Sequence, residues 1–124
     1  MAFEITGLDH VQVAIPKEGE EKAREFYSGI LGLKEVEKPP HLKVRGGAWF
    51  QCGSQQIHVG TVDSFLPAKK AHPAIIVRNI LALRSHLESF GLKPRDEEPL
   101  PGATRFFLDD PFGNRLEFLE WTQA

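Results

Sequence analysis

The sequence predicts an α+β fold built from two βαβββ modules. The first observation is an internal repeat, because the tripeptide Gly-Leu-Lys occurs at 32–34 and again 59 residues later at 91–93. The second is that each tripeptide follows a helix-like stretch, which itself follows a strand-like run near a histidine, at 9–15 and at 72–77. At 124 residues the chain has the length of one domain, so both modules are expected within a single domain, 1–124.

The two predicted helices are defined by their apolar spacing and by their ends. Apolar residues recur at helical spacing from 23 to 31 and again from 80 to 90. Gly32 and Gly91 stand where a left-handed C-terminal cap is typical. Asn79 stands at the expected N-cap of the second helix.

Three strands are expected after each tripeptide. They are predicted at 33–37, 44–52 and 55–62 in the first half, and at 92–96, 104–109 and 115–122 in the second. The run Asp-Pro-Phe-Gly-Asn at 110–114 is a strong turn signal between the last two strands. Module 1 is therefore expected at 1–62 and module 2 at 72–124, with a linker at 63–71.

Composition excludes several classes of function. The chain has 15 Lys and Arg against 17 Asp and Glu, a net charge of −2 with no basic stripe, so nucleic acid is not an expected partner. No apolar run approaches the roughly 18 residues of a membrane span, and no signal-peptide pattern opens the sequence. The single cysteine, Cys52, excludes an internal disulfide and fits a reducing compartment, so a cytoplasmic location is expected.

Strand alternation places a histidine or glutamate opposite the apolar face of several predicted strands. These residues are His10, His58, His72 and Glu117. His58 and Glu117 are 59 residues apart, and His10 matches His72 once a three-residue difference is absorbed by the loop at 16–19. If the modules pair about a pseudo-two-fold axis, the four side chains can converge. Imidazoles with one carboxylate suit Fe²⁺, Mn²⁺, Ni²⁺, Co²⁺ or Zn²⁺.

The alternative interpretation is that these residues are ordinary solvated side chains. Polar residues on the outer face of an amphipathic strand usually have no role in binding, and the shared offset is what sets these four apart. The other two histidines are given the ordinary interpretation. His41 is expected in a loop after Pro39-Pro40, and His86 on the solvent side of the second helix.

Three motifs carry a family resemblance that covers the whole chain. They are Leu8-Asp9-His10-Val11, Arg24-Glu25-Phe26-Tyr27 continuing to Leu31-Gly32-Leu33, and the ending from Asp110 to Phe118. The chain resembles the vicinal oxygen chelate superfamily, which includes glyoxalase I, bleomycin-resistance proteins, fosfomycin-resistance enzymes and extradiol dioxygenases. The resemblance implies paired βαβββ modules that form a cupped mixed sheet around a divalent metal ion.

The resemblance also implies a ligand set. His10 matches the first-strand ligand, His72 the fifth-strand ligand and Glu117 the eighth-strand ligand. His58 falls where glyoxalase I-like members carry a fourth-strand ligand, which in the bacterial enzymes looks like a glutamate. Because position 58 is a histidine here rather than a glutamate, Glu117 is the one obvious carboxylate that could act as the base. Dioxygenase-like members need only the His, His, Glu set, in which case His58 acts as an acid or base beside the metal.

The function implied is that of a divalent-metal-dependent, glyoxalase-like lyase or isomerase. Its small substrate would chelate the metal through adjacent oxygens, and Glu117 would move the proton. Gln12 and Trp49 are expected to contact substrate. Arg105 is expected either to hold an anionic group or to make a cross-strand charge pair.

Two alternatives stay open, and so does the assembly. The first alternative is an extradiol-type dioxygenase, and the second is a non-catalytic protein that binds a small molecule such as an antibiotic. Bleomycin-type binders lack metal ligands, which weighs against the second. A homodimer is expected, in which His10 and His58 could come from one chain and His72 and Glu117 from the other.

Overall fold

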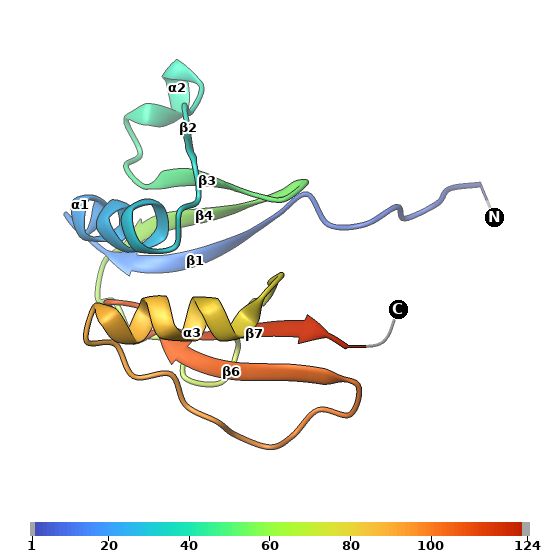
Figure 1. Cartoon of the computed structure of the whole chain (residues 1–124). Helices are drawn as coiled ribbons and strands as arrows, with labels where there is room; N and C mark the ends of the chain where they lie inside the picture. The colour runs from blue at the N-terminus through green and yellow to red at the C-terminus, as the bar shows by residue number, and fades with distance from the viewer. Residues whose placement is uncertain (1, 123–124) are drawn as a thin grey trace. The chain divides into compact units, whose positions relative to one another are not determined.

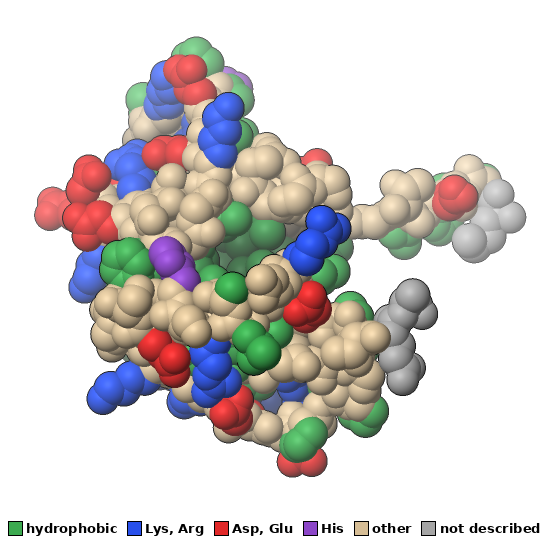
Figure 2. Space-filling view, in the orientation of Figure 1, with side chains coloured by type: hydrophobic (Ala, Val, Ile, Leu, Met, Phe, Trp, Pro, Cys, Tyr) green, Lys and Arg blue, Asp and Glu red, His purple; other side chains and the backbone are tan. Residues whose placement is uncertain are grey.

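The computed structural model describes residues 2–122, and it divides into two compact units, one up to Phe65 and one from Leu66 (Figure 1). Each unit combines a small sheet with helix, which confirms the predicted α+β class. None of the helices in the described part of the chain is both long and apolar enough to cross a membrane. On the face seen in Figure 2, basic and acidic side chains are interspersed.

Unit 1 contains a four-stranded sheet in the order β1-β4-β3-β2. Strand β1 pairs with β4 in parallel, and the other pairs are antiparallel. Helix α1 contacts β4 and the π-helical segment η1 contacts β3, so the buried rings of Tyr27 and Phe50 pack between helix and sheet. The elements are β1 (His10–Pro16), α1 (Glu20–Ala23), η1 (Arg24–Ile30), β2 (Glu35–Val36), α2 (Pro40–Lys43), β3 (Ala48–Cys52) and β4 (Gln55–Val62).

Unit 2 contains a three-stranded sheet in the order β5-β7-β6. Helix α3 contacts β7, and its buried side chains Ile80 and Leu87 join the apolar core with Phe106, Leu116 and Phe118. The elements are β5 (Ala74–Ile76), α3 (Ile80–Ser89), β6 (Ala103–Asp109) and β7 (Arg115–Trp121).

The strand registers reproduce the sequence repeat. Gln12 lies opposite His58 in the β1–β4 pair, and Ala74 lies opposite Glu117 in the β5–β7 pair. Position 58 of unit 1 and position 117 of unit 2 therefore occupy the same place in two sheets of the same topology. Gly32 and Gly91, the predicted C-terminal caps, have φ values of 78° and 79°, as a left-handed cap requires.

Several predicted strands are shorter than expected, including those at 33–37 and 72–77, which are observed as β2 and β5, and for two others the sequence shows the reason. The strand predicted at 92–96 is reduced to an isolated bridge between Arg95 and Phe107, because Pro94 beside it has no N–H to donate to a ladder. The strand predicted at 44–52 begins only at Ala48, since Gly46 and Gly47 form a turn with φ values of 74° and 83°.

The ends of the helices also differ from prediction. Asn79 occupies the N-cap position of α3, but its side chain makes no capping hydrogen bond. Glu120 of β7 does this instead, since its carboxylate accepts from the backbone N–H groups of Asn79 and Ile80. His41, expected in a loop, lies in the short helix α2, whereas His86 is exposed on α3 as predicted.

Candidate functional site

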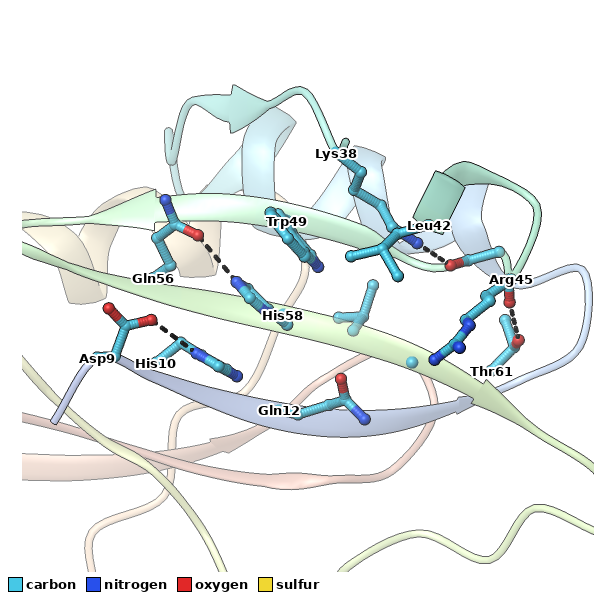
Figure 3. Close-up of a pocket in the computed structure, with 13 residues that line it drawn as sticks. Asp9, His10, Gln12, Lys38, Leu42, Arg45, Trp49, Gln56, His58 and Thr61 are labelled. Atoms are coloured by element: carbon cyan, nitrogen blue, oxygen red, sulfur yellow. Dashed lines mark hydrogen bonds and ion pairs between the residues drawn. The ribbon is translucent and has the colours of Figure 1, made fainter. Parts of the chain in front are cut away.

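A pocket of about 440 Å³ opens on the sheet of unit 1 (Figure 3). Its floor comes from β1, β3 and β4, because alternation points His10, Gln12, Trp49 and His58 to the same face of neighbouring strands. The pocket therefore collects four of the residues predicted from sequence to bind metal or substrate, with His58 at its centre.

His58 lies in a stack of three rings. Its ring centroid is 4.2 Å from that of Trp49 and 4.0 Å from that of His10, with interplanar angles of 6° and 15°. The two neighbours leave His58 only 5% exposed. Burial, helped by the neighbouring charge of His10, lowers the pKa of His58 to about 4, so the imidazole is neutral at physiological pH.

A chain of side-chain amides determines the tautomer of His58. Gln51 Nε2 donates to the backbone carbonyls of Gly53 and Gln55, at 2.8 and 3.0 Å. Its Oε1 therefore faces Gln56 Nε2, at 3.2 Å, and Gln56 Oε1 faces His58 Nε2, at 2.8 Å. Since carbonyl oxygens can only accept, His58 Nε2 carries the proton and its Nδ1 keeps the lone pair.

His10 has the opposite arrangement. Its Nδ1 lies 2.9 Å from the carboxylate of Asp9, so this nitrogen donates. In the neutral form of this ring, Nε2 keeps a lone pair. A histidine whose second nitrogen donates to a carboxylate is the usual form of a metal-ligating imidazole.

In unit 2, Glu117 is held between two partners. His72 Nε2 lies 2.9 Å from Oε1, and Arg105 Nη1 donates to Oε2 at 3.2 Å. The Glu117 side chain is only 8% exposed. Both oxygens of this buried carboxylate thus have a partner, as a buried charge requires.

Both ring nitrogens of His72 face acceptors. Nδ1 lies 2.7 Å from the backbone carbonyl of Lys70, and Nε2 faces the Glu117 carboxylate. A cation beside Nε2 and Oε1 would satisfy both lone pairs. An imidazole nitrogen and a carboxylate oxygen are both ligand types that divalent transition metals accept.

The donor atoms therefore fit a divalent metal in chemistry. Within either unit, over residues 2–122, no group of three or more His, Cys, Asp or Glu side chains gathers so as to hold a metal ion. Each unit instead offers a pair, His10 with His58 in unit 1 and His72 with Glu117 in unit 2.

The three residues predicted to contact substrate, Gln12, Trp49 and Arg105, lie in different surroundings. Trp49 forms a wall of the pocket, and Gln12 lies in it with its amide against Gly60, where a Cβ would come within 2.9 Å of Gln12 Nε2. Arg105 is taken up by Glu117 and by the backbone carbonyl of Glu98, so it makes the cross-strand pair. Burial raises the pKa of the Cys52 thiol, which makes it a poor nucleophile.

The two basic lining residues were not identified from the sequence. Lys38 and Arg45 flank helix α2 and both line the pocket. The signal that could have found them is the segment Pro39-Pro40 to Gly46-Gly47, in which turn residues bracket a basic loop.

Comparison with known structures shows close similarity to one protein and a shared fold with others. A protein assigned to the glyoxalase family from Bacillus anthracis is 48% identical, with a TM-score of 0.94 over 98% of this chain and 99% of that one. Lactoylglutathione lyase from Agrobacterium tumefaciens is 17% identical, with a TM-score of 0.74 over 94% and 95% of the two chains.

The fold also recurs in the fosfomycin resistance protein FosX from Listeria monocytogenes, at 17% identity and a TM-score of 0.75 over 97% of both chains. None of the curated proteins compared with this chain matches it. The family model of the Glyoxalase/Bleomycin resistance protein/Dioxygenase superfamily matches residues 7–118. The chain therefore belongs to this superfamily, as its motifs predicted.

Proposed function

We propose that the protein is a divalent-metal-dependent, glyoxalase-like lyase or isomerase, with His10, His58, His72 and Glu117 as metal ligands. The observation that carries the proposal is the equivalence of positions 58 and 117 in the two registers, each beside a histidine. The Nδ1 atoms of His10 and His72 both face an acceptor, which leaves Nε2 for a metal.

The chemistry assigns a role to each group. A bound divalent ion would polarise two adjacent substrate oxygens as a Lewis acid. Glu117 would take the substrate proton, because it is the buried carboxylate among the four residues. Arg105 would keep Glu117 oriented through Oε2, while Oε1 faces His72 Nε2.

The unit 1 pocket would receive the substrate. A volume of about 440 Å³ lies within the range of small-molecule sites, roughly 300–1,000 Å³. Trp49 offers an apolar wall, and Gln12 offers an amide that can both donate and accept. The similarity in fold to a lactoylglutathione lyase supports this reaction class.

Turnover by metal-loaded protein tests the proposal. We would assay hemithioacetals of 2-oxoaldehydes before and after chelation, and after Ni²⁺, Co²⁺, Zn²⁺, Mn²⁺ or Fe²⁺ is restored. Chelation and Glu117→Gln should each abolish turnover, whereas His86→Gln on the exposed face of α3 should not change it. Turnover that survives both chelation and Glu117→Gln would overturn the proposal.

One observation favours an extradiol-type dioxygenase as the second candidate. His58 Nε2 is occupied by Gln56, which suits a neutral acid or base beside a His10, His72 and Glu117 ligand set. Oxygen uptake with catechols by the Fe²⁺- or Mn²⁺-loaded protein would favour this candidate. Metal binding with neither activity would favour a small-molecule binding protein.

We also propose that the protein is a cytoplasmic homodimer. A chain of this size with a single half-buried cysteine suits a reducing compartment. Light scattering of the purified protein coupled to size exclusion should give a mass twice 13.9 kDa, and a monomer mass would contradict the dimer.

A further inference from the structure

Two basic side chains lie together at one end of the unit 1 pocket. Lys38 precedes helix α2 and Arg45 follows it, and both line the pocket. Figure 3 shows Arg45 beside Thr61 and Lys38 beside Leu42, both away from Asp9 and His10. The pocket therefore has an imidazole end and a cationic end.

The backbone that carries these cations is held in place. Gly47 N–H donates to the Glu20 carboxylate at 2.9 Å, and a Cβ on Gly47 would come within 2.3 Å of the Val59 carbonyl oxygen. The turn thus packs directly on β4. Lys38 Nζ donates to the carbonyl of Gly46, which ties the start of the loop to its end.

Both cations keep donors for a ligand. The Lys38 ammonium has three donors and spends one on the Gly46 carbonyl, and the charge of Glu20 nearby offsets part of its own. The guanidinium of Arg45 has five donors, and no ion pair engages it in the part of the chain that the structure describes. The carboxylate of Asp9, at the far end, is bonded to His10.

We propose that Lys38 and Arg45 form a subsite for an anionic group, a carboxylate or a phosphate, on the substrate of this pocket. The inference rests on the proposed function in one respect, because it assumes that the substrate's reacting oxygens lie at the His10 end. Arg45 can engage two anionic oxygens at once, and Lys38 adds a point charge. Leu42 and Trp49 supply an apolar wall between the two ends.

This subsite narrows the class of substrate. A neutral ligand would leave the two cations without a counter-charge while it covered them, which costs free energy. An organic acid or a phosphorylated compound with two adjacent oxygens at its other end would match both ends of the pocket. The substrate is therefore an anion in which the reacting oxygens and the charged group are separated by a short carbon chain or ring.

Fluorescence of Trp49 gives a direct binding assay. The chain has two tryptophans, and Trp121 is 52% exposed, so Trp121→Phe leaves Trp49 as the single reporter. Benzoate and inorganic phosphate would be titrated separately to distinguish a carboxylate from a phosphate site, with benzamide as the neutral probe. We expect at least one anion to change the emission and benzamide to bind at least about tenfold more weakly, since hydrogen bonds to a charged group are stronger.

Variants then test the two cations. Lys38→Gln and Arg45→Gln should each weaken anion binding about tenfold, the effect expected for the loss of one charge-assisted hydrogen bond. Lys43→Gln is the matched control, because Lys43 lies on the short helix between Lys38 and Arg45, pairs with Glu37 and does not line the pocket. Lys43→Gln should leave the affinity unchanged.

The results of these titrations can contradict the anion subsite and the proposed metalloenzyme independently of each other. Binding of both benzoate and phosphate that is no tighter than that of benzamide, or anion binding that is unchanged in the Lys38→Gln, Arg45→Gln double variant, would overturn the subsite. Absence of any emission change with both anions would overturn it as well. Metal content is measured on the same samples, so anion binding that depends on Lys38 and Arg45 in protein that takes up no metal would support the subsite and contradict the metalloenzyme.

Discussion

Positions 58 and 117 are equivalent in the two units, yet their surroundings are opposite. His58 lies between the rings of Trp49 and His10 and is held neutral, whereas Glu117 lies between Arg105 and His72 with a partner on each oxygen. In unit 1 this position buries a neutral imidazole, because stacked rings exclude water from it. In unit 2 it buries a carboxylate, because neighbouring side chains supply hydrogen-bond donors. The register is the same in both units, so the surroundings of this position depend on which side chains the neighbouring strands carry.

The loops before the third strand of each module differ as well. In unit 1, Gly47 precedes β3 and its turn packs on β4, so that Arg45 and Lys38 reach the pocket. In unit 2, Gly102 precedes β6 with a similar φ of 85°, but a Cβ there would meet only the Trp121 ring, at 3.9 Å, which is an ordinary van der Waals contact.

The largest expected effect distinguishes these two glycines. Gly47→Ala should destabilise the protein by about 3 kcal/mol or more, because a positive φ and a backbone overlap add together. Gly102→Ala should cost about 1 kcal/mol, from the positive φ alone. Urea unfolding of both variants measures the difference, and equal losses would contradict the close packing of the unit 1 turn.

The next effect compares the two buried groups. In metal-free protein, Glu117→Ala should cost about 2 kcal/mol, because it leaves the largely buried Arg105 without its carboxylate. His58→Ala should cost about 1 kcal/mol beyond the lost buried area, from its ring contacts. A double-mutant cycle with Arg105→Gln and Glu117→Gln measures the pairing. The double variant should lose less stability than the sum of the two single variants, and strictly additive losses would contradict the pairing.

A smaller effect concerns pH. The pKa of His58 falls from 6.5 to about 4 on folding, so between these values the unfolded chain binds more protons than the folded one. Stability should therefore decrease as the pH falls from 6.5 toward 4. Chemical denaturation of chelated protein at several pH values should show this slope. His58→Gln should flatten it and His86→Gln should not, so an unchanged slope in His58→Gln would contradict the neutral imidazole.

The smallest effect concerns the start of helix α3. The backbone N–H groups of Ile80 and Asn79 hold the pKa of Glu120 below its usual value. The cap therefore contributes stability above the ordinary pKa of a glutamate and loses it as the pH falls through the lowered value. In Glu120→Ala the two amides should exchange with solvent faster at pH 7, by NMR. Unchanged exchange of Asn79 and Ile80 would contradict the cap.

The fold could largely be predicted because its signals are local. The Gly-Leu-Lys repeat, the helical spacing and the turn at 110–114 each depend on a few adjacent residues, and the structure has the helices and most strands they predict. The cap at Asn79 could not be predicted, because Glu120 reaches it from a strand 41 residues further along the chain. Nor could the close packing of the Gly46-Gly47 turn on Val59, which lies on another strand.

The site was predictable by residue type but not by environment. Alternation identified His58 as a polar-face residue, yet its burial comes from two rings on neighbouring strands. Arg105 was open to two interpretations, and the structure shows its guanidinium paired with Glu117 on the adjacent strand. Lys38 and Arg45 were missed because their approach to the pocket depends on how the loop folds back.

The metal content of the full chain tests the central claim most directly. Purified protein would be chelated, repleted with one metal at a time, freed of excess and analysed by mass spectrometry of the elements. The account predicts one ion per chain, lost in His10→Ala of unit 1 and equally in His72→Ala of unit 2, and retained in His86→Ala. Protein that takes up no ion, or an ion that survives both His10→Ala and His72→Ala, would contradict it.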